Sequence, residues 1–241
     1  YLSICFAFHG LKQLNQNPSV GLQAIIDICG LTGREISMSD IIFKIGPRIN
    51  ASGRMESGRE SVDLLVERDL ASALLEAKHI DKYNDKRKDV DRQMTEEANQ
   101  IVERLESQKH QNSIVLYDEH WKKGVIGIVA SRLTEIYYRP TIVITREGDF
   151  ATGSARTAAG FDLYSAIESC SDLLTNFGGH TYAAGLTLRW ENVKEFRDRF
   201  QKYVDEHIEP HQTEATLDID AVIDFKDITK KFHNDLKRFA P

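Results

Sequence analysis

The sequence has 241 residues, of which 41% are hydrophobic and 28% charged, and its formal net charge is −6. These are ordinary values for a globular chain that is long enough for one large domain or two smaller ones. No apolar run approaches the roughly 18 residues of a membrane span, and no basic segment precedes the first apolar residues, so we expect a cytoplasmic protein outside the membrane. The three cysteines are far apart, which excludes a disulfide framework or a zinc site, and the negative charge argues against non-specific coating of nucleic acid.

The first 66 residues have a helical pattern. Apolar residues recur three or four apart between positions 11 and 28, and Gly30 is a plausible stop. Ser39-Asp40 is expected to cap a short helix, which Gly46-Pro47 ends because proline clashes with the preceding turn. The segment Arg48–Met55 therefore falls on a loop or at a helix start, and the apolar period resumes over Ser61–Leu70.

Residues 69–105 contain neither proline nor glycine, and their apolar residues fall three or four apart. One helix of roughly 55 Å is the natural interpretation at 1.5 Å per residue. Its middle, residues 81–89, is polar on every face, which is typical of a helix that connects two domains through solvent. A coiled-coil partner helix is the alternative, and the polar middle weakens it by interrupting the apolar seam.

After this helix the apolar period changes. The expected elements are, in order, a strand at 113–117, a helix at 124–138, a strand at 141–145, a turn at 147–149 into a strand that ends at a loop over 153–156, a helix at 162–169, a strand at 186–190, a helix at 193–204, a linker at 207–212, a strand at 216–220 and a helix at 223–236. Alternating strands and helices over about a hundred residues indicate a small α/β domain.

Two glycine-containing segments carry side chains suited to phosphate. In Asn176–Gly185, Gly178 and Gly179 run directly into His180, and bare glycine N–H groups beside a histidine make an anion site. The alternative is a tight turn before a strand, with the histidine an ordinary loop residue. Upstream, Ala151–Thr157 contains Ser154 and Arg156, and the arginine fork binds phosphate oxygens in pairs. The two loops are expected to converge on one anion.

A third segment is locally basic. Between Lys44 and Arg59 there are four basic residues and a single acid, interleaved with glycine, proline and asparagine. This density on a turn-rich stretch predicts a phosphate-binding surface, and a solvated basic face is the alternative.

These segments together resemble the substrate-binding half of the DHH phosphoesterases, in particular the RecJ-type single-strand-specific 5′ exonucleases. The likeness is carried by GSAR at 153–156, GGHxxAAG at 178–185, GVIGIVASRL at 124–133 and GPRINASGRM at 46–55. Four motifs in the order of the family, spread over most of the chain, make the resemblance specific.

The resemblance implies a domain plan of α/β class. Residues 1–68 would be the helical tail of a DHH domain, 69–109 a connecting helix, 110–207 the small mixed α/β DHH-associated, substrate-binding domain, and 213–241 the start of an oligonucleotide-binding (OB-type) domain. The chain then reads as a piece of a longer protein, and its catalytic half is expected upstream of Tyr1.

It also implies site residues. Those expected to bind a 5′ phosphate or terminal nucleotide are Ser154, Arg156, Gly178, Gly179 and His180, and those expected to face the same cleft from the other domain are Arg48, Asn50 and Arg54. Arg132 is expected to hold the strand–helix unit together. No catalytic residue is expected in this chain.

Two divalent ions, Mn²⁺ or Mg²⁺, are the cofactors that the resemblance implies for the whole enzyme. The sequence contains no Asp-His-His string. The nearest segment, Asp118-Glu119-His120, follows a strand, where three adjacent residues point to alternate faces and cannot all ligate one ion. We therefore expect no metal bound by residues of this chain, and no hydrolysis by the chain alone. Trp121 precedes Lys122 where the family has Trp-His, so any role of that histidine is in doubt here.

Three functions are then open. The first is a metal-dependent 5′-to-3′ exonuclease for single-stranded DNA in recombination and repair, with unspecified protein partners. The second is a DHH phosphodiesterase for oligonucleotides or dinucleotides, against which the start of a further domain after Gln212 argues. The third is a non-catalytic nucleic-acid-binding module like the domain that ends alanyl-tRNA synthetases. An Asp-His-His string upstream would favour an enzyme, and an aminoacylation core the third.

Overall fold

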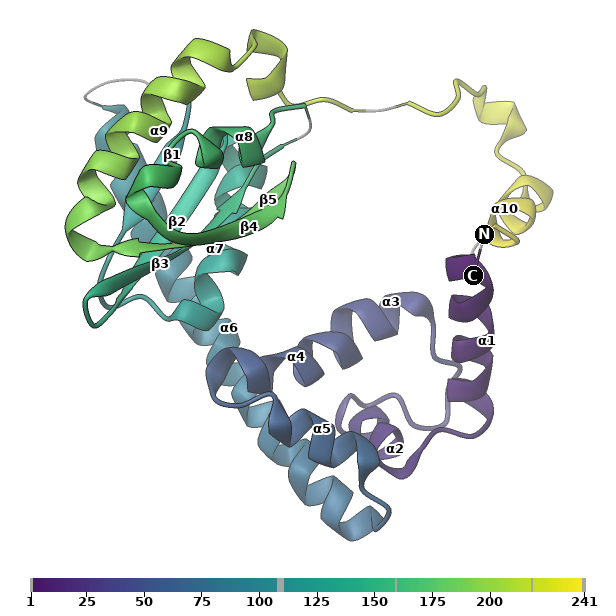
Figure 1. The fold of residues 1–241 in the computed structure, drawn as a ribbon. Coiled ribbons are helices and arrows are strands. Elements are labelled where there is room, and N and C mark those ends of the chain that lie inside the picture. Colours follow the sequence, from purple (N-terminus) through teal and green to yellow (C-terminus); the bar gives the residue numbers. More distant parts are fainter. Residues whose placement is uncertain (1, 108–110, 159, 218, 240–241) are drawn as a thin grey trace. The chain divides into compact units, whose positions relative to one another are not determined.

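The computed structural model describes residues 2–107, 111–158, 160–217 and 219–239, and Figure 1 shows its helices and strands. The chain divides into two compact units. Unit 1 consists of residues 1–85 and 216–241, and unit 2 of residues 86–215. The boundary at residue 85 falls inside the polar segment 81–89. No helix in the described ranges is both long and apolar enough to cross a membrane.

Unit 1 is helical. Its elements are α1 (Leu2–Gln16), α2 (Val20–Ile28), α3 (Met38–Asp40), a π-helix (Ile41–Ile45), α4 (Gly46–Met55), α5 (Arg59–Val66), the first part of α6 (Leu70–Glu106), a 3₁₀ turn (Phe225–Asp227) and α10 (Lys230–Lys237). Buried residues of α2, α5 and α6, including Ile25, Leu64 and Ile80, form one apolar core. The helical pattern predicted for this region is confirmed, because those residues share the buried sides of their helices.

The expected break at Gly46-Pro47 is wrong. The π-helix leads directly into α4, and the Gly46 N–H donates to the carbonyl of Ile41. Pro47 lies in the first turn of α4, where its missing N–H has no partner to lose. The motif GPRINASGRM is therefore the helix α4, so of the two expected placements the helix start is confirmed and the loop is wrong. The cap of the preceding helix is Ser37, two residues before the expected position, and it forms a capping box with Asp40.

The long helix is confirmed as α6, which has 37 residues. Its second part belongs to unit 2 and makes polar contacts with the rest of that unit. The Trp121 indole donates to Glu97 at 3.0 Å, Tyr137 to Asn99 at 3.3 Å, and Arg139 pairs with Glu106 at 2.6 Å. A further contact is made by Asp91, which is 1% exposed and lies 2.8 Å from Arg132. Arg132 was expected to hold the strand–helix unit together, whereas its ion pair joins α7 to α6.

Unit 2 is built on a five-stranded sheet in the order β1-β2-β3-β5-β4. Its elements are β1 (Ile114–Tyr117), α7 (Lys123–Tyr137), β2 (Thr141–Glu147), β3 (Phe150–Arg156), α8 (Leu163–Glu168), a 3₁₀ turn (Ser171–Leu173), β4 (Leu174–His180), β5 (Ala183–Arg189), a 3₁₀ turn (Trp190–Asn192), α9 (Val193–His207) and a 3₁₀ turn (Pro210–Thr213). The pair β1 and β2 is parallel and the other pairs are antiparallel. The predicted β-α-β unit and mixed α/β class are confirmed.

Helices cover the two faces of the sheet unequally. On one face, α8 and α9 cover the sheet (Figure 1). Ala166, Phe196 and Phe200 of these helices form one core with Ala155 and Leu188 of the strands. On the other face, α7 packs on β2 and β3. Gly185 and Gly178, on the neighbouring strands β5 and β4, are exposed. The second face therefore has an open part that begins beside α7.

Three sequence expectations need correction here. GSAR lies within β3 and GGH at the end of β4, so neither segment is a loop. The strand β4 was not expected at all. In the segment 216–220, Asp218 lies outside the described residues, and its described neighbours form no strand. Apolar side chains of this segment and the next, such as Leu217, Val222 and Phe225, are exposed. The OB-type start stays a prediction.

Candidate phosphate-binding site

The pairing of β3, β5 and β4 brings the two predicted segments together. Ser154 is opposite Gly185, which is opposite Gly178, and one row further Arg156 is opposite Ala183, which is opposite His180. Directly paired residues project to the same face of a sheet, as do residues two apart on one strand. Ser154, Arg156, Gly178 and His180 therefore share one face, which we call the open sheet face together with Ala183 and Gly185. The strand register thus brings the two segments together on one face, and the anion between them stays a prediction.

Gly179 is the exception among the predicted residues, because its partner is Ala184 on the core side. A Cβ atom at Gly179 would lie 2.3 Å from the carbonyl oxygen of Ala183, and the φ of Gly179 is +155°. Gly179 therefore has a structural role, but not the expected one in a tight turn: glycine is needed inside β4 so that this strand can approach β5. By contrast, a Cβ atom at Gly178 would meet nothing within 4 Å. Gly178 thus presents bare backbone to open space.

Arg156 is positioned from two sides. Its Nη1 donates to Ser154 Oγ at 2.9 Å and to the Ala155 carbonyl at 2.7 Å. On the α7 side, a Cβ atom at Gly127 would lie 3.0 Å from Ser154 Oγ and 3.2 Å from Arg156 Nη2. Gly127 therefore lets the helix come close enough to hold the guanidinium at the border of the open sheet face.

His180 is held in one tautomer. The backbone N–H of Tyr182 donates to its Nδ1 at 3.3 Å. A nitrogen that accepts a hydrogen bond carries no proton, so the neutral ring carries its proton on Nε2. The exposed imidazole is thus a hydrogen-bond donor at Nε2 without needing to be charged.

This arrangement suits one small anion. The backbones of β3 and β4 are two strand spacings, about 10 Å, apart. Arg156 and His180 therefore stand on either side of a floor made by Ala183, Gly185 and Gly178. A guanidinium, an N–H donor and exposed backbone are the groups that bind phosphate oxygens in proteins.

The three predicted residues of α4 differ from one another. Arg48 donates to Asp81 at 2.7 Å and to the Lys44 carbonyl at 3.0 Å, and its side chain is 17% exposed. These contacts fasten α4 to α6 within unit 1. Asn50 is exposed, and Arg54, one turn further along α4, is half-buried.

The residues around β1 do not fit a metal site. Asp118 accepts a hydrogen bond from the His120 N–H at 2.8 Å, and Glu119 lies 3.3 Å from Arg146. Across the described part of the chain, no group of three or more His, Cys, Asp or Glu residues is arranged to hold a metal ion. Lys123, near the position where the family has a histidine, pairs with Glu147 at 2.6 Å, and this bond lowers the pKa of Glu147.

Sequence reasoning missed two residues of the site. Gly127 and Gly185 lie inside the quoted motifs, yet only the strand register and the packing of α7 show that they shape the open sheet face. Gly185 could have been identified from the sequence, because side chains alternate along a strand and residues 183 and 185 therefore lie on the same face.

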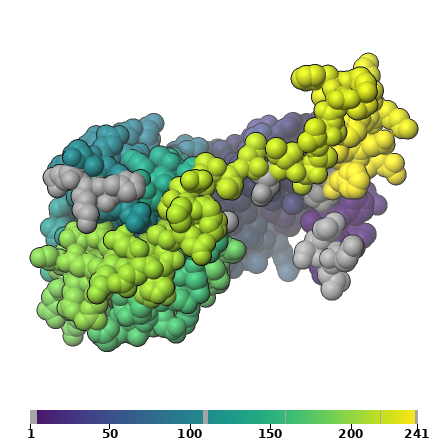
Figure 2. All heavy atoms as spheres, turned by 90° about the horizontal axis from the view of Figure 1, so that it is seen from above, coloured from purple at the N-terminus to yellow at the C-terminus, as the bar shows by residue number. Residues whose placement is uncertain are grey.

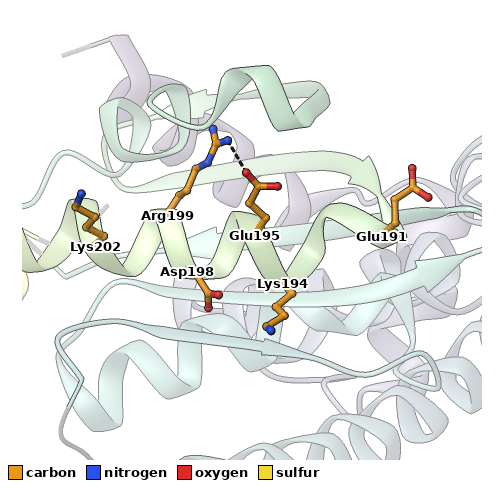
Figure 3. A pocket seen from close by; sticks show the side chains of 6 residues that line it. All are labelled: Glu191, Lys194, Glu195, Asp198, Arg199 and Lys202. Carbon is orange, nitrogen blue, oxygen red and sulfur yellow. Dashed lines mark hydrogen bonds and ion pairs between the residues drawn. The ribbon is translucent and has the colours of Figure 1, made fainter.

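Unit 2 also has a hollow away from the open sheet face. It has a volume of about 540 Å³ and runs along α9, a helix that Figure 2 shows at the surface in yellow-green. Its lining consists of charged side chains of both signs, namely Glu191, Lys194, Glu195, Asp198, Arg199 and Lys202 (Figure 3). Arg199 is paired with Glu195 and Asp172. Because the charges neutralise each other and α9 covers the opposite face of the sheet, this hollow is not the phosphate site.

Comparisons with known proteins agree with this arrangement. The DHHA1 domain model matches residues 110–206. The chain is 35% identical to the single-stranded-DNA-specific exonuclease RecJ of Bacillus subtilis over 234 residues, which cover 96% of this chain and 30% of that protein. RecJ of Thermus thermophilus in complex with Mn²⁺ superposes with a TM-score of 0.73 at 28% identity, over 83% of this chain and 29% of that one.

A crystal structure of exonuclease RecJ bound to manganese has a TM-score of 0.70 at 29% identity, over 86% of this chain and 50% of that one. The chain spans 30 to 40% of the length of the curated RecJ relatives that it matches. The chain therefore belongs to the RecJ-type members of the DHH phosphoesterase family, and residues 110–206 are its DHHA1 domain.

Proposed function

We propose that this chain is part of a metal-dependent, single-strand-specific 5′-to-3′ DNA exonuclease, and that the open sheet face of unit 2 binds the 5′ phosphate of the strand. The observation that carries the proposal is the placement of Arg156 and the Nε2–H of His180 on either side of bare backbone at Gly178 and Gly185. The similarity to RecJ over 96% of the chain supports the activity.

The charge of the ligand favours a strand end over the middle of a strand. A terminal phosphate carries about 1.5 to 2 negative charges at neutral pH, whereas a phosphodiester carries one. The Arg156 fork and the His180 donor therefore gain more from a terminal 5′ phosphate. Fixing that phosphate sets the distance to the bond that is cut, so that hydrolysis starts from the 5′ end.

Further parts of the proposal concern the whole protein. The catalytic ions are Mn²⁺ or Mg²⁺ and are held by residues outside these 241. The protein acts in the cytoplasm, in recombination and repair. Asn50 and Arg54 contact the DNA. The placement of the metal ligands outside this chain is supported by its coverage of only 30% of the length of the Bacillus subtilis relative. A phosphodiesterase for short oligonucleotides and a non-catalytic module have less support, because the similarity to RecJ includes unit 1 as well as the DHHA1 domain.

Binding to three ligands tests the phosphate site. We expect the chain to prefer a short single strand with a 5′ phosphate over its 5′-hydroxyl twin and over a blunt duplex, in fluorescence anisotropy titrations at one low salt concentration. Arg156→Ala or His180→Ala removes a charge-assisted hydrogen bond worth roughly 1.5 to 3 kcal/mol. Each variant is therefore expected to lose affinity mainly for the phosphorylated strand.

Arg197→Ala is the matched control. Arg197 lies on α9, behind the sheet, and has an ion pair with Asp198. Its loss changes the net charge by the same amount as Arg156→Ala, so any effect of net charge alone appears in both variants. If Arg156→Ala loses the same affinity for the phosphorylated and the hydroxyl strand, the phosphate site is contradicted.

A further inference from the structure

A hollow of about 280 Å³ borders the candidate phosphate site. It lies between α7 and the end of β3. Ser131 and Glu135 of α7 and its cap Tyr138 line one side, and Arg156 of β3 and the following Thr157 line the other. Arg156 thus belongs to the hollow and to the open sheet face at once. Whatever is attached to a phosphate bound at Arg156 lies within reach of the hollow.

The backbone at Tyr138 is strained. Tyr138 is the C-terminal cap of α7, with a φ of +53° and a ψ of +39°, and among the described residues no other non-glycine residue has a positive φ. This left-handed conformation favours glycine at the ends of helices, because a side chain there costs free energy. A bulky residue in such a conformation is a reason to look for a role of its side chain. Here the side chain lines the hollow and is exposed.

The charges around the hollow exclude a second phosphate. Arg156 stands at one border, and the exposed carboxylate of Glu135 is part of the wall. A phosphodiester entering the hollow would be repelled by Glu135, whereas an uncharged ring would not. A carboxylate only accepts hydrogen bonds, and the N–H edges of nucleobases only need acceptors. An aromatic side chain beside it supplies a stacking surface for a flat ring.

We propose that this hollow holds the nucleobase of the nucleotide whose 5′ phosphate is bound at Arg156 and His180. Tyr138 stacks on the base, and Glu135 accepts a hydrogen bond from it. The inference rests on the proposed function of the open sheet face and adds a positioning role, because a base held in the hollow orients the terminal nucleotide.

The test compares three short strands on the full 241-residue chain by fluorescence anisotropy. They are a 5′-phosphorylated strand, the same strand with an abasic 5′-terminal nucleotide, and its 5′-hydroxyl twin. Stacking on an aromatic residue predicts that the abasic strand binds roughly five- to 150-fold more weakly than the intact phosphorylated strand. In Tyr138→Gly this difference is expected to shrink to the share that the hydrogen bond to Glu135 contributes, while the preference for phosphate over hydroxyl remains.

Protein stability and a control variant separate a loss of base binding from other effects of the substitution. Glycine relieves the left-handed strain at position 138, so Tyr138→Gly is expected to fold at least as stably as the wild type in thermal denaturation. Tyr182→Ala is the matched control, since Tyr182 is an exposed tyrosine beside His180 that does not line the hollow. It is expected to keep the penalty for the abasic strand.

The outcomes separate the two proposals. If the wild type distinguishes phosphate from hydroxyl but binds the abasic strand equally well, the base site is overturned and the phosphate site stands. A penalty for the abasic strand that is undiminished in Tyr138→Gly also overturns the base site. If phosphate and hydroxyl strands bind alike, the phosphate site fails, and with it the base site. Should no strand bind measurably, an NMR titration with a deoxynucleoside 5′-monophosphate decides, and an unshifted Tyr138 resonance overturns the base site.

Discussion

Two adjacent glycines at the end of β4 have opposite environments, and this contrast can be tested residue by residue. A methyl group at Gly179 would clash with the backbone of Ala183, so Gly179→Ala is expected to destabilise unit 2 by roughly 1 to 3 kcal/mol. A methyl group at Gly178 meets no atom, so Gly178→Ala is expected to keep the stability of the wild type or to raise it by up to about 1 kcal/mol. Urea unfolding followed by tryptophan fluorescence measures both changes, because Trp121 and Trp190 lie in unit 2.

The same pair of variants tests the floor of the phosphate site. Gly178→Ala places a methyl group where an anion would approach the bare backbone, so a weaker preference for the 5′-phosphorylated strand is expected in a fully folded protein. A Gly178→Ala variant that binds this strand as the wild type does would show that the anion does not lie over Gly178. Unchanged stability of Gly179→Ala would contradict the β4–β5 register on which the site depends.

At the scale of elements, the sequence predicted which residue types make up the site better than it predicted the secondary structure that carries them. Small residues and the phosphate-competent Arg156 and His180 were identifiable, because residue chemistry is local. The strand β4 was not, because Gly178 and Gly179 are poor strand formers, and this strand forms through its pairing with β5. Likewise, GPRINASGRM was expected to interrupt a helix, because the π-helix that leads into Pro47 leaves no local signal in the sequence.

The contact between α6 and α7 gives a prediction at the same scale. Arg132→Ala leaves Asp91, which is 1% exposed, with the more distant Arg87 at 3.7 Å and Thr95 at 3.5 Å. A buried carboxylate that loses a partner costs roughly 1 to 3 kcal/mol, so the urea midpoint read by tryptophan fluorescence is expected to fall. Trp121 is a suitable reporter, because its indole bonds to Glu97 of the same helix α6.

Arg92→Ala is the control for Arg132→Ala. Arg92 pairs with Asp89 on the same helix at 2.8 Å, but both side chains are 70% exposed. An exposed pair contributes about 0 to 1 kcal/mol. If the two variants lose the same stability, the Arg132–Asp91 pair does not fasten α6 to α7.

At the scale of the whole molecule, the apolar period of α6 and its polar middle predicted a helix connecting two bodies, and the two separate cores agree with two units. One core belongs to unit 1 and the other to the sheet of unit 2. The segment after residue 212 could not be predicted with the same success. Its alternating pattern indicated a strand, but a strand needs a partner to pair with, and alternation along one segment does not supply one.

The two cores lead to a prediction about acid unfolding. Asp40 in unit 1 accepts hydrogen bonds from Lys44, Ser37 and Arg34, and these bonds, the one from Lys44 first, hold the pKa of its carboxyl group well below the usual range. A lowered folded-state pKa means that the stabilisation is present above the unfolded pKa of about 3.9 and is lost as the pH falls through the folded value. Helical signal by circular dichroism includes unit 1, whereas tryptophan fluorescence reports on unit 2 alone. In Asp40→Asn we therefore expect a weaker dependence of the circular dichroism transition on pH below about 4, and an unchanged fluorescence transition. A fluorescence transition that shifts together with the circular dichroism signal would mean that the two units unfold as one.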